Sequence, residues 1–213
     1  LVDQGVPLEE ARGYALAGCL DLNLPGRSRI YALGMFIIPK VLDVTMHNGI
    51  MRETGERIGP ATGEMKDFKS YEDFEAAFKE QLYHFMGMYN EEHNILIRVT
   101  RAVNCDVVHS AFAYDGIKCG KDIMDRKMPY ENASLMNPVG MICVANSLAA
   151  VKKLVFQDKV CTMEELYDAI EADWEGYEEL HKKCVDAPKF GNGIDLVDDI
   201  AADLYKFWAA SCN

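Results

Sequence analysis

The sequence lacks several features that would assign it to a broad class at once. No run of about eighteen apolar residues occurs, so we expect no membrane-spanning helix. The N-terminus has no basic region followed by a hydrophobic stretch, so we expect no secretory signal. The seven cysteines include no Cys-x-x-Cys spacing, which leaves zinc-ribbon and iron–sulfur sites without support. An initiator methionine is also missing, and Leu1-Val2-Asp3 indicates a chain entered in mid-course.

Positive charge is scarce. The 22 basic residues stand against 34 acidic ones, which gives a net charge of −12, and the basic residues cluster only as Lys152-Lys153 and Lys182-Lys183. Such a chain repels nucleic acid, so we expect no nucleic-acid partner. The odd number of widely spread cysteines and the eleven methionines favour a reducing, cytoplasmic compartment, and an oxygen-poor one fits equally well.

One cysteine, Cys19, lies in a run of residues 14–20 that contains no charge. Apolar surroundings keep a thiol protonated, which disfavours a nucleophile or a metal ligand but suits a donor of a hydrogen atom. Alternation of leucines with polar residues predicts a short strand over residues 19–24, with Cys19, Asp21 and Asn23 on one face. Taken alone, Cys19 is better explained as a buried core cysteine, because free cysteines are among the most buried residues.

The remaining pattern predicts a helix-rich chain with a few short buried strands. Capping signals open helices at Ser70 and Thr162, each with an acidic residue three positions later. Cys143 is expected on the buried face of its helix, and the other cysteines besides Cys19 are expected to be packing residues. The helices are expected over residues 7–17, 31–47 with a kink at Pro39, 74–89 with a second helix towards 102, 140–155, 162–184 and 195–208. The remainder is expected as a short apolar segment over residues 109–119, and as loops or turns over 52–66, 121–137 and 187–193.

Four segments, in a fixed order, span almost the whole chain. They are Glu9-Glu10-Ala11-Arg12 leading to Gly18-Cys19-Leu20-Asp21; Met46-His47-Asn48-Gly49 followed by Thr62-Gly63-Glu64 and by residues 67–72; residues 146–155; and Ala187-Pro188-Lys189-Phe190-Gly191-Asn192 with Asp195 and Asp198. Together these segments resemble an internal piece of a glycyl radical enzyme of the pyruvate formate-lyase type.

This resemblance implies a fold and a catalytic residue. The fold is a helix-rich α/β barrel with strands inside and helices outside. Residues 1–213 would be one partial catalytic domain, truncated at both ends and without the C-terminal glycyl radical domain. Cys19 would be the cysteine that becomes a thiyl radical. The radical glycine would lie outside the chain and be installed by a radical S-adenosylmethionine activating enzyme, so this segment binds no cofactor or metal and is inactive alone.

The loop Cys19–Ser28 resembles most the fumarate-adding branch, the alkylsuccinate and benzylsuccinate synthases of anaerobic hydrocarbon degradation. Dehydratases and decarboxylases of the family usually place glutamate two residues after the cysteine, where this chain has Asp21. The substrates would be fumarate and an alkane or alkylbenzene, with small accessory subunits and an oligomer as partners. Arg27 and Arg29 could then hold the dicarboxylate through paired hydrogen bonds.

Several alternatives remain open at this point. The protein could be a glycyl radical dehydratase or arylacetate decarboxylase whose glutamate has become Asp21, or a non-catalytic interaction protein. Asp21 could only cap a turn, and Arg27 and Arg29 could be ordinary surface arginines. His84 and His93 carry no ligand pattern, so we expect no metal site. His47 is expected to be a structural residue at a helix end.

Overall fold

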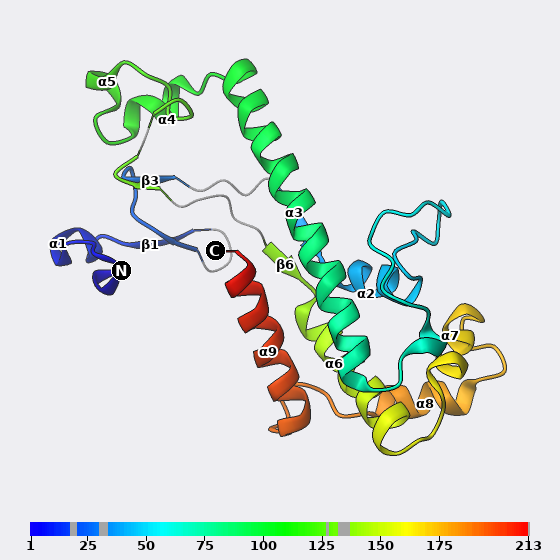
Figure 1. The fold of residues 1–213 in the computed structure, drawn as a ribbon. Helices are drawn as coiled ribbons and strands as arrows, with labels where there is room; N and C mark the ends of the chain where they lie inside the picture. Colours follow the sequence, from blue (N-terminus) through cyan, green and yellow to red (C-terminus); the bar gives the residue numbers. More distant parts are fainter. Residues whose placement is uncertain (18–20, 30–33, 127, 132–136, 213) are drawn as a thin grey trace. The chain divides into compact units, whose positions relative to one another are not determined.

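The chain divides into two compact units in the computed structural model. Unit 1 comprises Leu1–Met35 and Asn90–Asn137, and unit 2 comprises Phe36–Tyr89 and Pro138–Asn213. The division falls within the longest helix, α3 (Tyr71–Val103), which is labelled in Figure 1. The structure describes residues 1–17, 21–29, 34–126, 128–131 and 137–212.

Unit 1 consists of short helices and two small sheets. Strand β1 pairs antiparallel with β2, and β3 pairs in parallel with β5. A small apolar cluster of Val6, Ala11 and Leu24 is buried, and Tyr130 packs against it. In addition to the end of α3, the elements are η1 (Val2–Gln4), α1 (Leu8–Ala11), β1 (Ala15–Ala17), β2 (Asp21–Asn23), β3 (Ser28–Arg29), α4 (Val107–Phe112), α5 (Gly116–Cys119) and β5 (Tyr130–Glu131).

The first predicted helix is wrong in its extent. Residues 7–17 were expected to be helical throughout, but α1 ends at Ala11 and Ala15–Ala17 form a strand. Pairing with Asp21–Asn23 outweighs the helix propensity of the two alanines, which is a weak local preference. The predicted strand at 19–24 is confirmed over Asp21–Asn23, within the described residues.

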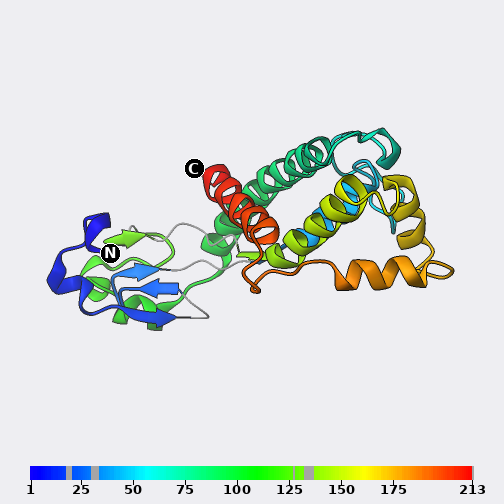
Figure 2. The ribbon, with the colours of Figure 1, turned by 90° about the horizontal axis from the view of Figure 1, so that it is seen from below.

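Unit 2 is built around helix α6, which packs against α9 and against α2. Strands β4 and β6 pair with each other just before α2 and α6 begin. Figures 1 and 2 show α3, α6 and α9 side by side. The fully buried side chains include Phe74, Phe78, Leu82, Leu148 and Leu204. The elements besides α3 are β4 (Met35–Ile37), α2 (Ile38–Met46), η2 (Met65–Asp67), β6 (Asn137–Val139), α6 (Met141–Val151), the π-helical turn η3 (Lys152–Gln157), α7 (Met163–Glu171), α8 (Glu178–Asp186) and α9 (Asp195–Ser211).

Helix beginnings follow the sequence signals closely. The side chains of Ser70 and Asp73 bond each other's backbone N–H groups at 3.1 and 3.0 Å, which confirms the first predicted cap. Thr162 and Glu165 form the same box at 3.0 and 2.7 Å. Pro39 opens α2 instead of kinking a longer helix, because a missing N–H costs nothing in the first turn.

Helix ends and continuations are predicted less well. Helix α3 runs unbroken through the place where two helices were expected. Conversely, the helix expected over residues 162–184 is split into α7 and α8, because Asp173, Trp174 and Gly176 adopt positive φ angles. The short apolar segment expected over residues 109–119 contains the end of α4 and all of α5, and its Phe112 and Ile117 are 86% and 84% exposed.

The Thr162 cap gives a local stability prediction. Thr162→Ala removes the acceptor for the Glu165 N–H and is expected to destabilise α7 by about 1 kcal/mol. Hydrogen exchange of the α7 amides should quicken accordingly. Ser147→Ala is the matched control, because the Ser147 hydroxyl donates only to the Cys143 carbonyl one turn back in its own helix. An α7 that exchanges at the parental rate in Thr162→Ala would contradict the role of the cap.

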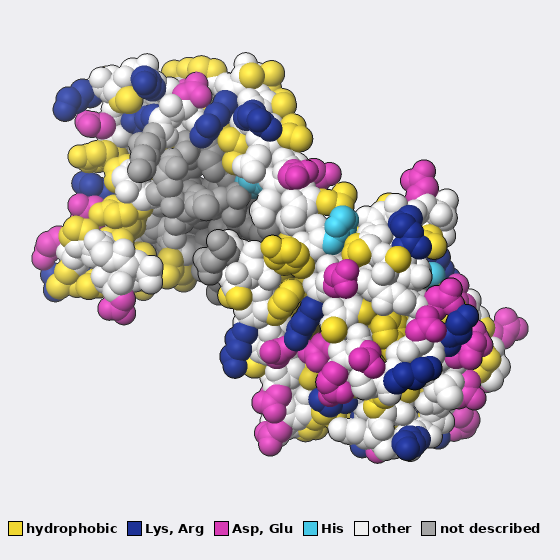
Figure 3. All heavy atoms as spheres, viewed as in Figure 1, with side chains coloured by type: hydrophobic (Ala, Val, Ile, Leu, Met, Phe, Trp, Pro, Cys, Tyr) yellow, Lys and Arg dark blue, Asp and Glu magenta, His cyan; other side chains and the backbone are white. Residues whose placement is uncertain are grey.

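The surface corrects the expectation for the cysteines. Cys143 is exposed and not on the buried face of α6, and Cys105, Cys119 and Cys212 are exposed as well. Figure 3 shows acidic and basic side chains interspersed over unit 2. Among the described residues, no helix is both long enough and apolar enough to cross a membrane. The sheets formed by the described residues are all two-stranded, so the barrel stays a prediction.

Candidate functional site

Cys19, the expected radical cysteine, lies outside the described residues, but the strands on either side of it are described. β1 and β2 pair antiparallel, with Ala15 opposite Asn23 and Ala17 opposite Asp21. In sequence, residues 18–20 connect these two facing ends. We call the paired strands β1 and β2, which flank Cys19 in the sequence, the Cys19 hairpin. Asp21 contributes its backbone to β2 in the part of the chain that is described.

Glu10 joins three segments of unit 1 beside this hairpin. Its carboxylate Oε2 accepts a hydrogen bond from Arg27 Nη1 at 3.2 Å and another from the Tyr130 hydroxyl at 2.8 Å. Glu10 lies in α1, Arg27 in the turn after β2, and Tyr130 in β5. The pKa of Tyr130 is raised above its usual value, chiefly because the Glu10 carboxylate accepts the phenol's hydrogen bond, with burial and the negative charge of Glu10 acting in the same direction. Two donors therefore converge on one carboxylate.

The turn after β2 is held by its own hydrogen bonds. The Ser28 hydroxyl accepts from the Leu24 N–H at 2.9 Å and lies within hydrogen-bond distance of the Asn23 side-chain oxygen. The guanidinium of Arg27 lies over the Tyr114 ring, with Cζ 4.4 Å from the ring centroid. The Tyr114 N–H in turn donates to the Gly26 carbonyl at 2.6 Å. Arg27 is thus fixed by an anion and by an aromatic face.

The structure places the predicted substrate clamp as follows. Arg27 is paired with Glu10, and the side chains of the pair are 37% and 30% exposed. Arg29 lies in β3, where its backbone pairs with Glu131. The roles of Cys19, Asp21, Arg27 and Arg29 therefore stay predictions.

Sequence reasoning missed Glu10, Tyr114 and Tyr130 as parts of this region. From the sequence, Glu10 was named only as part of a segment that resembles the family. Tyr130 lies 120 residues further along the chain. No local spacing signal links residues so distant, so the contact could only come from the structure.

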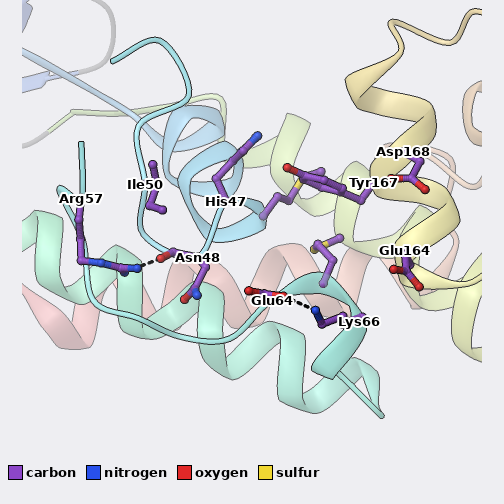
Figure 4. Close-up of a pocket in the computed structure, with 11 residues that line it drawn as sticks. His47, Asn48, Ile50, Arg57, Glu64, Lys66, Glu164, Tyr167 and Asp168 are labelled. Carbon is purple, nitrogen blue, oxygen red and sulfur yellow. Dashed lines mark hydrogen bonds and ion pairs between the residues drawn. The ribbon is translucent and has the colours of Figure 1, made fainter. Parts of the chain in front are cut away.

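A pocket lies in unit 2, beside the end of α2 and the start of α7 (Figure 4). Its volume is about 440 Å³. Tyr167 packs edge-on against the His47 ring at 5.4 Å, and apolar side chains complete the wall. The lining residues are Met46, His47, Asn48, Ile50, Arg57, Glu64, Met65, Lys66, Glu164, Tyr167 and Asp168.

Arg57, Lys66 and His47, which line this pocket, each contact another protein group. Arg57 donates to the Asn48 carbonyl at 2.6 Å, and Lys66 pairs with Glu64 at 2.7 Å (Figure 4). His47 Nδ1 lies 2.7 Å from the Asp43 carbonyl, and its Nε2 lies 3.2 Å from Glu171. These contacts tie the end of α2 to α7. They confirm His47 as a residue at a helix end and give the pocket a structural role.

No group of three or more His, Cys, Asp or Glu side chains gathers as a metal site in the described part of the chain. His84 Nε2 lies 3.2 Å from the Ile58 carbonyl, which is a backbone contact. The described residues around the Cys19 hairpin contact one another through the ion pair and hydrogen bonds of Glu10, Arg27 and Tyr130.

Comparison with known proteins decides the family. The profile of the pyruvate formate lyase-like family matches residues 1–213. This chain belongs to that family of glycyl radical enzymes. Its members carry a glycyl radical that an activating enzyme installs. Four segments chosen from the sequence alone therefore pointed to the right family.

The similar proteins include dehydratases and decarboxylases. The chain is 31% identical to (2S)-3-sulfopropanediol dehydratase of Klebsiella oxytoca, over 97% of its own length and 25% of that enzyme. It is 28% identical to indoleacetate decarboxylase of Tractidigestivibacter scatoligenes, over 96% of its length and 26% of that enzyme. The structure of hydroxyproline dehydratase from Clostridioides difficile matches with a TM-score of 0.90 at 29% identity, covering 99% of this chain and 27% of that one.

These comparisons refine two expectations. The chain spans about a quarter of the length of the curated relatives it matches. The match to solved glycyl radical enzymes confirms a helix-rich α/β piece of this fold. The relatives catalyse elimination and decarboxylation, and this similarity does not support the expected fumarate-adding branch.

Proposed function

We propose that the chain is part of the catalytic subunit of a glycyl radical lyase in which Cys19 carries the thiyl radical. The glycyl radical takes the hydrogen atom of the Cys19 thiol, and the thiyl radical then takes a hydrogen atom from a substrate C–H bond. The substrate radical reacts, and the product radical retakes the hydrogen atom from the thiol. Family membership over the whole chain, together with a paired hairpin that has Cys19 in its connection, supports this role.

The reaction class that we propose is elimination or decarboxylation of a small polar substrate. The observation that carries it is the similarity, over nearly the whole chain, to dehydratases and decarboxylases. In the elimination of water from a diol, the carbon–oxygen bond next to the substrate radical breaks and the leaving hydroxyl takes up a proton to depart as water. The hydroxyl on the radical carbon loses its proton and becomes the carbonyl of the product radical, so protons balance. Asp21, two residues after Cys19, is the acid that we propose for the proton of the leaving hydroxyl. Its side chain is one methylene shorter than glutamate, so the leaving group must lie closer to the backbone of β2.

Fumarate addition is the second candidate, and Asp21 itself favours it. Addition of a carbon radical to the fumarate double bond forms one carbon–carbon bond and releases no leaving group. This chemistry therefore needs no strong acid at residue 21. Arg29 and Arg27 would bind the dicarboxylate, and Arg27 would exchange Glu10 for a substrate carboxylate. Small accessory subunits belong to this candidate.

A product assay distinguishes the two candidates. The full-length, activated protein is incubated without oxygen with glycerol, propane-1,2-diol, trans-4-hydroxy-L-proline, isethionate or indoleacetate, and separately with fumarate plus hexane or toluene. We expect dehydration, sulfite release or carbon dioxide release from one of the polar substrates, detected by mass spectrometry. A substituted succinate as the sole product would replace elimination and decarboxylation by fumarate addition.

A further inference from the structure

We propose that Glu10 is a positioning residue that holds both sides of the Cys19 hairpin in place. The proposal rests on the proposed role of Cys19 as the radical residue. It assigns to Glu10 no contact with substrate; its action is through the segments that carry Cys19.

The first step of the argument is where Glu10 and Arg27 lie in the chain. Glu10 is in α1, just before β1, and Arg27 is in the turn just after β2. Their ion pair, at 3.2 Å, joins residues 17 positions apart and so closes a loop that contains the whole hairpin. Breaking this ion pair would therefore release the segment before β1 and the segment after β2 at the same time.

The second step is the third segment on the same carboxylate. The Tyr130 hydroxyl donates to Glu10 Oε2 at 2.8 Å, and the Tyr130 N–H donates to the Arg27 carbonyl at 3.0 Å. Tyr130 also packs on the buried cluster of Val6, Ala11 and Leu24, which come from both sides of the hairpin. Glu10 therefore joins α1, the turn after β2 and strand β5.

The third step is that Arg27 is oriented independently of Glu10. Its guanidinium lies 4.4 Å from the centroid of Tyr114, and the Tyr114 N–H bonds the Gly26 carbonyl. A guanidinium already seated on a ring presents its N–H groups in a fixed direction. Because Arg27 is held in this way, its ion pair with Glu10 also fixes the distance between α1 and the turn after β2. An isolated surface ion pair constrains such a distance poorly, because both side chains are free to move.

The fourth step is why the hairpin needs this support. A two-stranded hairpin is marginally stable by itself, and β1 and β2 have three residues each. Transfer of a hydrogen atom requires the reacting atoms in near-attack geometry, where an error of about 1 Å can cost about a hundredfold in rate. We infer that holding the segments before β1 and after β2 through Glu10 supplies that accuracy.

The test compares two neighbouring glutamates in the full-length protein. Glu10→Gln keeps the size of the side chain but removes its charge and one acceptor oxygen. Glu9→Gln is the matched control, because Glu9 lies in the same helix turn but pairs only locally with Arg12, with both side chains largely exposed. Hydrogen exchange of the amides of residues 15–23 is measured before activation, so the result does not depend on radical chemistry. We expect exchange about tenfold faster in Glu10→Gln and at the parental rate in Glu9→Gln.

Turnover provides the readout that a purely structural role would not change. With glycerol, or with fumarate and hexane, according to the product assay, Glu10→Gln should lower kcat about tenfold or more at unchanged KM, normalised to the glycyl radical signal. In a Glu10→Gln/Arg27→Gln double variant, exchange should be no faster than in Glu10→Gln. A higher KM in Arg27→Gln, together with a parental kcat in Glu10→Gln, would show that Arg27 binds a substrate carboxylate and would overturn the positioning role of its pair with Glu10.

The outcomes separate this proposal from the proposed function. Parental exchange over residues 15–23 in Glu10→Gln, or equal acceleration in Glu9→Gln, overturns the positioning role. Faster exchange with unchanged kcat also overturns it. Product formed at the parental rate by Cys19→Ser overturns the radical role of Cys19, and the exchange result then shows only that Glu10 holds the hairpin.

Discussion

Cys19→Ser in the full-length, activated protein is expected to abolish product formation, with kcat lowered about 10⁴-fold or more. A serine O–H bond is much stronger than a cysteine S–H bond, so the glycyl radical cannot take its hydrogen atom. The relay between glycine and substrate is broken at its middle member. The glycyl radical itself should still be installed, because activation acts on the glycine. Electron paramagnetic resonance measures that radical, and mass spectrometry measures product in the same sample.

The control for this result is another cysteine of unit 1. Cys105 is an exposed free thiol after the end of α3, so Cys105→Ser should leave turnover at the parental rate. A loss of product in both variants would indicate general damage to the unit instead of a broken relay. Product at the parental rate in Cys19→Ser, with the radical signal present, would show that hydrogen transfer does not pass through residue 19.

The position of Cys19 could be predicted from local sequence, but its surroundings could not. A charge-free run followed by alternating leucines marked the residue and the following strand, which the structure confirms over Asp21–Asn23. The preceding strand was missed because Ala15-Leu16-Ala17 has high helix propensity, and only its partner strand reveals it. Glu10 and Tyr130 were missed because their contact joins distant parts of the chain.

The helical part of the fold shows which signals are reliable. The boxes at Ser70 and Thr162 were found because each is a contact between residues three positions apart. The break between α7 and α8 was missed because it depends on a positive φ at Trp174, a conformation that bulky residues adopt rarely and that the sequence therefore does not signal. The exposure of Cys143 was missed because α6 is apolar over most of its circumference. Its sequence therefore does not mark which side faces the solvent.

Overall sequence identity and the residues near Cys19 point to different reactions within the family. Similarity over 97% of the chain to a dehydratase reports a shared family and a shared local fold. The leaving-group chemistry depends on a few side chains near Cys19, of which residue 21 is one. Fold-wide identity of 31% is therefore compatible with a different reaction at the same hairpin. For this reason the product assay, and not a closer comparison of sequences, decides between elimination and fumarate addition.

Gly49→Ala is expected to have the largest effect on stability. Gly49 follows α2 with a φ of +80°, and its carbonyl accepts hydrogen bonds from the N–H groups of Ile58 and Gly59 at 2.9 and 3.0 Å. A Cβ atom there would lie 2.6 Å from the Gly59 carbonyl oxygen and closer still to that of Pro60. These are backbone atoms of a loop held against residue 49, so they cannot rotate away.

Gly55→Ala is the matched control, because it separates the cost of a positive φ from the cost of the clash. Gly55 lies in the same loop with a φ of +72°, but a Cβ atom there meets nothing within 4 Å. We expect Gly55→Ala to cost about 1 kcal/mol, and Gly49→Ala to cost about 3 kcal/mol or more, because it adds steric overlap with the backbone. Hydrogen exchange of the amides of residues 44–59 in the full-length protein measures both, and about 3 kcal/mol corresponds to exchange roughly a hundredfold faster. Equal exchange in the two variants would show that the loop moves aside, and that the close approach of residue 49 to Gly59 and Pro60 is not what holds the end of α2.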